Sequence, residues 1–361
     1  MVDGKTQPRR RVVKVGTSLL RGSSDRPTTA VIADLAASMN AAVRRGERLV
    51  LVTSGAVGLG CSSLQMDSRP NEVEALQAAA AVGQGRLMGM YQDAFAVRGL
   101  TVAQVLLTRG DMASRRRYQN ACRTLDQLLD WGVVPVVNEN DTLATDELRF
   151  GDNDTLSALV AVAIKADELI LLTDIDRLYS SDPRQDASAA PIDEVSEPGE
   201  LERLHQSAGG GGQWGTGGMT TKLAAARIAT SSGISVKLAD GRAPTTLDAL
   251  LAGERIGTLF QPWLDPLPDR KRWLAHALLP KGSLQLDVGA EHALKVRGAS
   301  LLAVGITAVD GDFGPREAVR LLAADGRELG RGLATLDSDA VRHVLGQPGV
   351  EVVHRDRLAL F

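Results

Sequence analysis

Two hydrophobic patterns alternate along the first two thirds of the chain. Short runs of β-branched and other apolar residues are followed by longer segments in which apolar positions recur every three or four residues, as in 28–45 and 114–130. Nearly continuous apolar strands separated by helices are typical of a mostly parallel sheet with helices on both faces. We therefore predict an α/β fold arranged as a three-layer sandwich. The predicted strands are 11–15, 48–53, 101–107, 133–137, 168–173 and 234–238.

The pattern changes near residue 257. The prolines between 257 and 273 interrupt regular structure and indicate a linker. Beyond them, short apolar segments are separated by closely spaced turns, which predicts a small, mainly β second domain. The predicted parts are a first domain over 1–261, a linker over 262–274 and a second domain over 275–361.

Composition narrows the classes of partner. The chain has 361 residues, 44% hydrophobic and 24% charged, with a formal net charge of −3 at pH 7. A length above about 250–300 residues favours two domains. The small net charge gives no electrostatic reason to expect a nucleic acid or an anionic membrane as the main partner. The region 275–361 holds 10 Lys and Arg against 11 Asp and Glu, so an RNA partner is not expected there.

The cysteines and the N-terminus indicate a compartment. Cys61 and Cys122 are too few for a disulfide framework, and no apolar run approaches the ~18 residues of a membrane span. The N-terminal segment is polar and lacks a signal-peptide pattern. These features predict a cytoplasmic protein. The basic cluster 9–11 leads directly into the first strand, and we interpret it as a solvated strand entry.

The segment 215–222, Gly-Thr-Gly-Gly-Met-Thr-Thr-Lys, is the most informative motif. Glycines let backbone N–H groups turn toward an anion at positive φ. The helical pattern that follows adds free N–H groups and the positive end of a helix dipole, and Lys222 adds a full charge. The segment thus indicates a polyphosphate cradle without P-loop spacing. A flexible glycine-rich surface loop is the alternative, and the glycine run 209–212 fits it.

Four further segments place polar residues where a predicted strand ends, the edge at which parallel sheets bind ligands. Lys14 lies near the end of the first strand, where a buried ammonium group is costly unless it meets an anion such as a phosphate. The second segment offers the hydroxyl of Ser54 and neighbouring N–H donors. The other two segments contribute Asn138, Asp141, Asp152, Asn153 and Asp154, and Thr173 and Asp174.

Some of these features have simpler interpretations. Asp and Asn residues before a helix are usually caps, and capping alone would explain the segment FGDND at 150–154. The glycines of GQGRLMG, at 83–89, lie within a long helical pattern, where close helix packing explains them better than a dinucleotide site.

Together, and in this order, KVGTS, VTSGAVGLG, VNEND, FGDND, LTDIDRLYSSDPR and GTGGMTTK strongly resemble the glutamate 5-kinase family of the amino acid kinase superfamily. The resemblance spans roughly residues 10–260 and implies the amino acid kinase fold. The region from about 275 onward resembles the PUA domain that follows the kinase domain in many members. Arg177 stands where the family commonly has glycine, so an altered turn near the nucleotide is expected.

The resemblance implies a role for each matched residue. Lys14 and Lys222 would contact the transferred phosphoryl group, and Asp154 would hold the two lysines in place. No protein metal site is implied. The residues implied for glutamate are Ser54, Asp141 and Asn153, with Asn138 and Asp152 as further contacts. The residues implied for the nucleotide are Lys14, Thr173, Asp174, Thr216, Gly217, Gly218, Met219, Thr220, Thr221 and Lys222.

The implied function is ATP-dependent phosphorylation of the γ-carboxylate of L-glutamate to L-glutamyl 5-phosphate, the first step of proline biosynthesis, with Mg²⁺ entering with ATP. A carboxylate acceptor is ionised near neutral pH, with a reference pKa of about 4, so no general base is needed. Proline is the expected feedback inhibitor, because Asp141 suits its cationic nitrogen and Asn153 can donate to its carboxylate. A homo-oligomer and a transient coupling to glutamate-5-semialdehyde dehydrogenase are also expected, and a membrane partner is not.

Two alternatives remain open. Another superfamily kinase, acting on aspartate, acetylglutamate or UMP, would share the phosphate cradle. The segment VNENDTLATDELRFGDND and the PUA-like tail favour free glutamate. An RNA-binding protein that uses the PUA-like domain would need a basic surface, which the balanced charge of 275–361 does not indicate.

Overall fold

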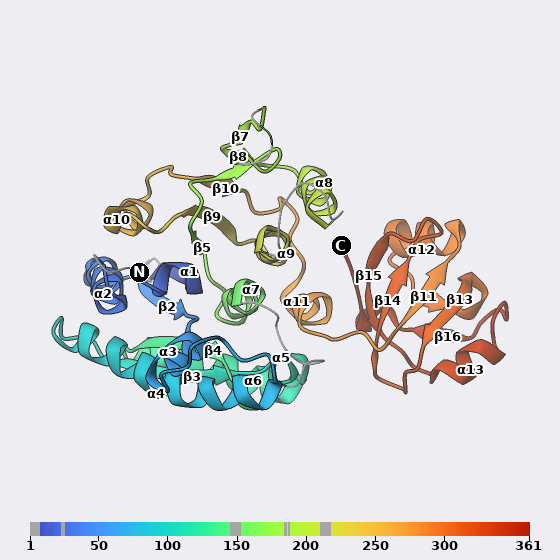
Figure 1. Ribbon diagram of the computed structural model, residues 1–361. Coiled ribbons are helices and arrows are strands. Elements are labelled where there is room, and N and C mark those ends of the chain that lie inside the picture. The colour runs from blue at the N-terminus through green and yellow to red at the C-terminus, as the bar shows by residue number, and fades with distance from the viewer. Residues whose placement is uncertain (1–7, 23–25, 145–152, 184–185, 187, 210–217) are drawn as a thin grey trace, which may run out of the picture. The chain divides into compact units, whose positions relative to one another are not determined.

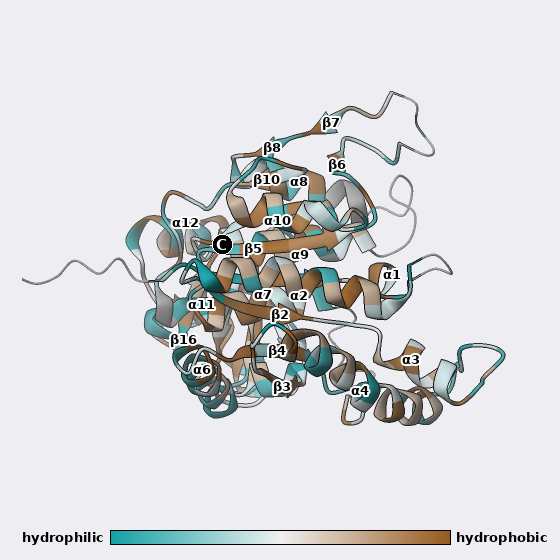
Figure 2. Cartoon of the chain, turned by 90° about the vertical axis from the view of Figure 1, so that its left-hand side faces the viewer, coloured by the Kyte–Doolittle hydropathy of each residue, from teal (hydrophilic) through white to brown (hydrophobic). Residues whose placement is uncertain are grey.

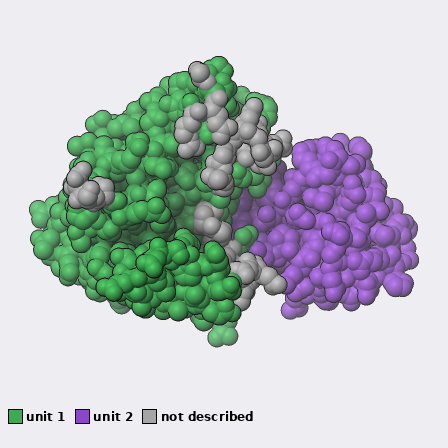
Figure 3. All heavy atoms as spheres, viewed as in Figure 1, with its two compact units in different colours: residues 1–111, 116–266 green, residues 112–115, 267–361 purple. Residues whose placement is uncertain are grey.

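The computed structural model describes residues 8–22, 26–144, 153–183, 186, 188–209 and 218–361. The chain divides into two compact units (Figure 3). The first unit comprises 1–111 and 116–266, and the second comprises 112–115 and 267–361.

The first unit is built on an eight-stranded sheet in the order β3-β4-β2-β1-β5-β9-β10-β8 (Figure 1). Neighbouring strands are parallel from β3 to β9, whereas β10 is antiparallel to β9. The predicted mostly parallel sheet is confirmed. Its strands are β1 Arg10–Val15, β2 Arg48–Val52, β3 Val102–Leu107, β4 Val134–Glu139, β5 Glu168–Thr173, β8 Glu194–Val195, β9 Ser235–Asp240 and β10 Thr258–Phe260, and β6 Leu178–Tyr179 pairs separately with β7 Pro191–Ile192.

Helices cover both faces of this sheet. On one face α2 contacts α4 and α10, and on the other α7 contacts α9, which also contacts α8. Figure 2 shows apolar strands inside and α6 as largely hydrophilic. The helices are α1 Thr17–Leu20, α2 Thr28–Arg44, α3 Ala56–Ser63, α4 Val73–Ala96, α5 Arg109–Ala113, α6 Arg115–Asp130, α7 Asn153–Ala163, α8 Pro198–Gly209, α9 Gly218–Thr230 and α10 Pro244–Ala252.

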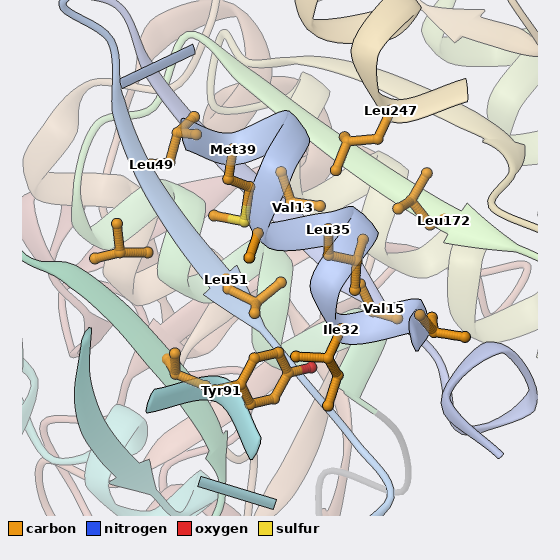
Figure 4. Packing of buried hydrophobic residues seen from close by; sticks show 14 of the residues in the cluster. Val13, Val15, Ile32, Leu35, Met39, Leu49, Leu51, Tyr91, Leu172 and Leu247 are labelled. Carbon is orange, nitrogen blue, oxygen red and sulfur yellow. The ribbon is translucent and has the colours of Figure 1, made fainter. Parts of the chain in front are cut away.

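Successive side chains of β1 point to alternate faces of the sheet, so Val13 and Val15 lie on one face and Lys14 lies on the other. Val13 and Val15 lie in a buried cluster with Ile32 and Leu35 of α2 (Figure 4). Because successive side chains of a strand point to opposite faces, Lys14 points to the face covered by α7. The strand thereby supplies core packing and a positioned cation at once.

The interpretation of residues 9–11 as a solvated strand entry is wrong for Arg11. Its side chain is 2% exposed, and its guanidinium lies 2.9 Å from Glu47 and 3.1 Å from the buried Glu168. Lys237 of β9 reaches the Glu168 carboxylate at 3.3 Å. Burial lowers the pKa of Arg11, and the two carboxylates oppose that shift. This buried ion-pair network joins β1, β5 and β9.

Helices α3 and α4 pack with their backbones in contact. A Cβ on Gly83 of α4 would lie 1.8 Å from the carbonyl oxygen of Ala56, so only glycine allows this approach. The predicted packing role is confirmed for Gly83. It does not extend to Gly85 and Gly89, since a Cβ at either would meet open space.

Gly83→Ala is expected to lower the free energy of unfolding by about 1–3 kcal/mol, because the added methyl forces the two helices apart. Gly85→Ala is the matched control on the same helix. It is expected to be neutral or stabilising by up to about 1 kcal/mol, because alanine is the better helix former. Urea unfolding of both variants measures the difference, and equal stabilities would contradict the packing argument.

The second unit is mainly β, as predicted. A five-stranded sheet in the order β13-β11-β14-β15-β17 and the pair β12-β16 enclose an apolar cluster that includes Leu284, Val319 and Val352. Of the predicted linker 262–274, the residues from Asp269 on are helical. The elements are α11 Asp269–His276, β11 Gly282–Leu286, α12 Val288–Arg297, β12 Leu301–Leu302, η2 Ala303–Gly305, β13 Ile306–Gly311, β14 Ala318–Leu322, β15 Glu328–Leu333, α13 Ser338–His343, β16 Glu351–Val353, η3 Arg355–Arg357 and β17 Leu358–Leu360.

Among the described residues, none of the helices combines the length and apolar character that crossing a membrane requires.

Candidate active site

A cavity of about 380 Å³ lies at the carboxyl ends of β1, β2 and β4, beside the first turns of α7 and α9. Its place follows from the strand order. The chain leaves β1 for β2 on one side and later adds β5 on the other, and a parallel sheet forms a crevice at such a switch point. The lining residues are Lys14, Gly16, Thr17, Ser18, Ser54, Gly55, Ala56, Val57, Gly58, Arg69, Asn138, Glu139, Asp141, Asn153, Asp154, Gly218, Thr221 and Lys222.

Lys14, Asp154 and Lys222 form one lysine–aspartate cluster in this lining. The ammonium nitrogen of Lys14 lies 2.5 Å from Asp154 Oδ1, and that of Lys222 lies 3.2 Å from Oδ2. Thr221 donates its hydroxyl to the same Oδ2 at 2.9 Å. One carboxylate therefore fixes two ammonium groups that come from different elements, one on β1 and one on α9.

The carboxylate of this cluster is almost fully buried, with 2% of the side chain exposed. Burial alone raises the pKa of Asp154, but Lys14 and Lys222 together outweigh burial and hold that pKa below its ordinary value. Asp154 is therefore ionised at neutral pH, and its negative charge lies between the two ammonium groups.

Asn138 and Asn153 form an amide cluster in the same lining, in which Asn153 directly precedes Asp154 in α7. Asn153 Nδ2 lies 2.9 Å from Asn138 Oδ1, 2.9 Å from the hydroxyl oxygen of Ser54 and 2.6 Å from the carbonyl oxygen of Thr53. Asn138 Nδ2 donates to Gln84 Oε1 at 2.7 Å. These contacts join the ends of β2 and β4 to the first turn of α7.

The donor end of the Asn153 amide is thus engaged within the protein. Its Oδ1 is buried and has no partner among the described residues. Donation from Asn153 to a substrate carboxylate, as the sequence suggested, would require the contacts to Ser54 and Asn138 to be exchanged. Asp141 lies two residues beyond the end of β4 and lines the same cavity.

The structure gives positions for some of the predicted nucleotide residues. Thr173 and Asp174 end β5, where the Thr173 hydroxyl donates to Asp174 at 3.2 Å, but the described cavity lining includes neither. Gly218, Met219 and Thr220 form the first turn of α9, so the helix begins earlier than the pattern from Lys222 onward predicted. The calls on Asp152, Thr216 and Gly217, and on the glycine run beyond Gly209, fall outside the described residues.

Arg177 does not alter the backbone in the way a lost glycine would. Its φ is not among the positive values found in the described chain, so the position does not need glycine. The guanidinium lies 3.0 Å from Asp176 and 2.5 Å from Asp193. Hydrogen bonds to these two carboxylates raise the pKa of Arg177.

Sequence reasoning missed two charged lining residues and one supporting residue. Glu139 lies in the VNEND segment beside Asn138, so its position carried a signal. Arg69 comes from the segment between α3 and α4, and Gln84 from the middle of α4. No local pattern connects either to the strand ends, because only the packing of α4 brings them there.

Known protein families match both parts of the chain. The model of the amino acid kinase family matches residues 9–240, and that of the PUA domain matches residues 282–355. The uridylate kinase of Archaeoglobus fulgidus, a solved structure, is 18% identical with a TM-score of 0.46, and the alignment covers 69% of this chain and 99% of that one.

Curated relatives match over nearly the full length. The chain is 61% identical to the glutamate 5-kinase of Synechococcus sp. (strain CC9605) and 63% identical to that of Parasynechococcus marenigrum (strain WH8102). Each alignment covers 97% of this chain and 98% of the relative. The glutamate 5-kinase of Synechococcus elongatus (strain ATCC 33912 / PCC 7942 / FACHB-805) is 50% identical, again over 97% and 98% of the two chains.

Proposed function

This chain belongs to the glutamate 5-kinase family of amino acid kinases, and from its site we propose how it transfers a phosphoryl group from ATP to L-glutamate. The product is L-glutamyl 5-phosphate, the first intermediate of proline biosynthesis. A γ-carboxylate oxygen forms a bond to the γ-phosphorus. The bond from that phosphorus to the β,γ-bridging oxygen breaks, and ADP leaves with the electron pair.

The lysine–aspartate cluster is the main structural support for this mechanism. The transferred phosphoryl group gains negative charge on its outer oxygens and on the leaving oxygen, and preorganised cations stabilise that charge. Lys14 and Lys222 both line one cavity and are held there by Asp154, so they need little reorganisation to contact the group. The acceptor carboxylate is already ionised near neutral pH, so positioning and charge neutralisation suffice.

Glutamate fits the part of the cavity lined by Ser54, Asn138, Asp141 and Asn153. Asp141 supplies a carboxylate for the α-ammonium group, and Ser54 and the N–H groups at the start of α3 suit the α-carboxylate. Gly55 makes this turn possible, because its φ of 97° lies in the left-handed region between β2 and α3. In this pose the γ-carboxylate points toward Lys14. The amide cluster would complete the pocket around the substrate's backbone end.

The nucleotide would occupy the side of the site formed by the end of β5 and the start of α9. Phosphoryl transfer in this family generally needs a divalent metal, and we propose Mg²⁺ bound to the phosphates, where it neutralises charge. Among the described residues no cluster of three potential metal ligands forms a cage. A Mg²⁺ ion that keeps waters and phosphate oxygens as ligands needs no such cage. Thr173 and Asp174 end β5 on this side and are proposed nucleotide contacts.

The direct test traps the acyl phosphate with hydroxylamine in the presence of ATP and Mg²⁺. L-Glutamate is expected to give hydroxamate, whereas L-aspartate, N-acetylglutamate and UMP are not. Hydroxamate from aspartate or acetylglutamate at a comparable rate, or ADP release with UMP, would assign another member of the superfamily.

Proline is expected to compete with glutamate, because both present an α-carboxylate and a cationic α-nitrogen. Asp141→Asn should weaken both ligands by about 1.5–3 kcal/mol through the loss of a charge-assisted hydrogen bond. Steady-state KM for glutamate and Ki for proline measure this. Asp130→Asn, which removes a carboxylate paired with Arg48 at the other end of the sheet, is the matched control. Full proline sensitivity in Asp141→Asn would contradict a shared site.

Four further expectations stay predictions. They are a homo-oligomer, a transient coupling to glutamate-5-semialdehyde dehydrogenase, a cytoplasmic location and the absence of an RNA partner. Filter binding of RNA at low and moderate salt tests the last one, since a bound polyanion would respond strongly to salt.

A further inference from the structure

Helix α4 packs against the elements that form the proposed glutamate pocket. At Gly83 the backbone of α4 lies against the backbone of Ala56 in α3. This contact fixes the position of the next residue, Gln84, relative to the strand ends. Two turns later on the same face, the buried hydroxyl of Tyr91 lies 2.7 Å from Thr53 Oγ1, just after the end of β2. The helix therefore contacts the amide cluster and one of its backbone partners.

The contact made by Gln84 completes an amide chain whose direction begins at the Thr53 carbonyl oxygen, which can only accept. Its Oε1 accepts a hydrogen bond from Asn138 Nδ2 at 2.7 Å. With the nitrogen of Asn138 turned toward α4, the oxygen of the same amide faces Asn153 and accepts from it at 2.9 Å. An amide has one donor end and one acceptor end, so a turn of Asn138 breaks both contacts at once.

The chain ends on residues that line the cavity. Asn153 Nδ2 also lies within hydrogen-bond distance of Thr53 O and Ser54 Oγ, so the orientation of Asn138 is coupled to that of Asn153 and Ser54. Asn138 is 2% exposed, so its amide can reach little water. A hydrogen bond that it loses within the protein is therefore not readily replaced by one to solvent. Gln84 itself is not among the cavity-lining residues of the described chain.

We propose that Gln84 is a positioning residue of the glutamate pocket, acting through Asn138. It accepts the Asn138 amide hydrogen and thereby holds Asn138 in the orientation in which the Asn138–Asn153–Ser54 hydrogen bonds form. The inference rests on the proposed function of this cavity.

Gln84→Met tests it, because methionine keeps the length of the side chain and removes the oxygen acceptor. The KM for glutamate is expected to rise about 3–10-fold, the net worth of one neutral hydrogen bond. The kcat at saturation and the KM for MgATP should stay within about twofold. Gln84→Glu retains an acceptor for Asn138 Nδ2, so its glutamate KM should fall between those of the wild type and Gln84→Met.

A double-mutant cycle separates positioning from a general structural role. In an Asn138→Ala background, Gln84→Met should change the glutamate KM by less than twofold, because the residue through which it acts is absent. Gly85→Ala, beside Gln84 but in open space, is the control for disturbance of α4 and should match the wild type. Thermal unfolding is measured for each variant to check that it is folded. If Gln84→Met does not fold, Gln84→Ala is used in its place.

The outcomes distinguish the inference from the function it rests on. A wild-type enzyme that fails to phosphorylate glutamate overturns the proposed function. An active wild type with an unchanged glutamate KM in Gln84→Met, a parallel rise in the KM for MgATP, or a full effect in the Asn138→Ala background overturns only the role of Gln84.

Discussion

Lys14→Ala and Lys222→Ala should each lower kcat about 10²–10³-fold, with far smaller effects on the KM for glutamate. Each ammonium group is held beside the cavity by the Asp154 carboxylate, at 2.5 Å and 3.2 Å respectively. An interaction that strengthens as charge moves to the transferred phosphoryl group is lost mainly from the transition state, and such a loss appears in kcat.

Hydroxamate formation at saturating glutamate and MgATP measures these rates. Lys295→Ala is the matched control, because that exposed lysine pairs with Glu291 in the second unit. Lys14→Arg should recover only part of the loss, since a planar guanidinium does not place its charge where the ammonium lies. Near wild-type turnover in either alanine variant would remove that lysine from the mechanism.

Asp154→Asn is expected to affect both folding and catalysis. Removing one partner from a buried ion pair typically costs about 3–5 kcal/mol, because the remaining charges are left uncompensated. Here two lysines, with 7% and 14% of their side chains exposed, would lose a shared counter-charge. The kcat should fall about as far as in Lys14→Ala, since neither cation would be held in place.

Two measurements check the role of this carboxylate. Urea unfolding at neutral pH gives the loss of stability, and the double variant Lys14→Ala/Asp154→Asn should be much less impaired in kcat than the product of the two single effects. Fully multiplicative effects on kcat, or an Asp154→Asn protein with wild-type stability and turnover, would contradict a shared electrostatic unit.

The stability difference should also depend on pH. The lysines hold the pKa of Asp154 below that of the unfolded chain, so its contribution is present above the unfolded value of about 4 and is lost as pH falls through the lower folded value. The gap between wild type and Asp154→Asn should therefore narrow below about pH 4. A gap that widened with acid would reverse the sign of the inferred shift.

Much of the sheet could be predicted because its signal is local. The apolar runs at β1, β2, β4 and β5 are long enough to show a buried strand, and helical spacing separates them. The edge strand β8 and its neighbour β10 were missed because two or three residues display no period. Arg11 was misinterpreted for a related reason, because its partners Glu47 and Glu168 come from other parts of the chain.

In the candidate site, too, some residues could be predicted from the sequence and others could not. Its motifs were recognisable because each is a short polar segment at a strand end, where glycine, hydroxyl and charged residues stand out against apolar neighbours. Gln84 was not recognisable, because a glutamine within an amphipathic helix looks like any solvated residue. Its contact with Asn138 exists only because α4 packs beneath β4 and β2.

By itself, the sequence determined that this protein has a mostly parallel sheet, a mainly β second part, and chemically active segments at the carboxyl ends of strands. Side-chain periodicity and turn chemistry are properties of neighbouring residues, so they can be read along the chain. Only the tertiary structure decided that Lys14 and Lys222 share Asp154 and that α4 places Gln84 against Asn138. Those contacts depend on strand order and helix packing, in which distant segments meet by burying apolar faces.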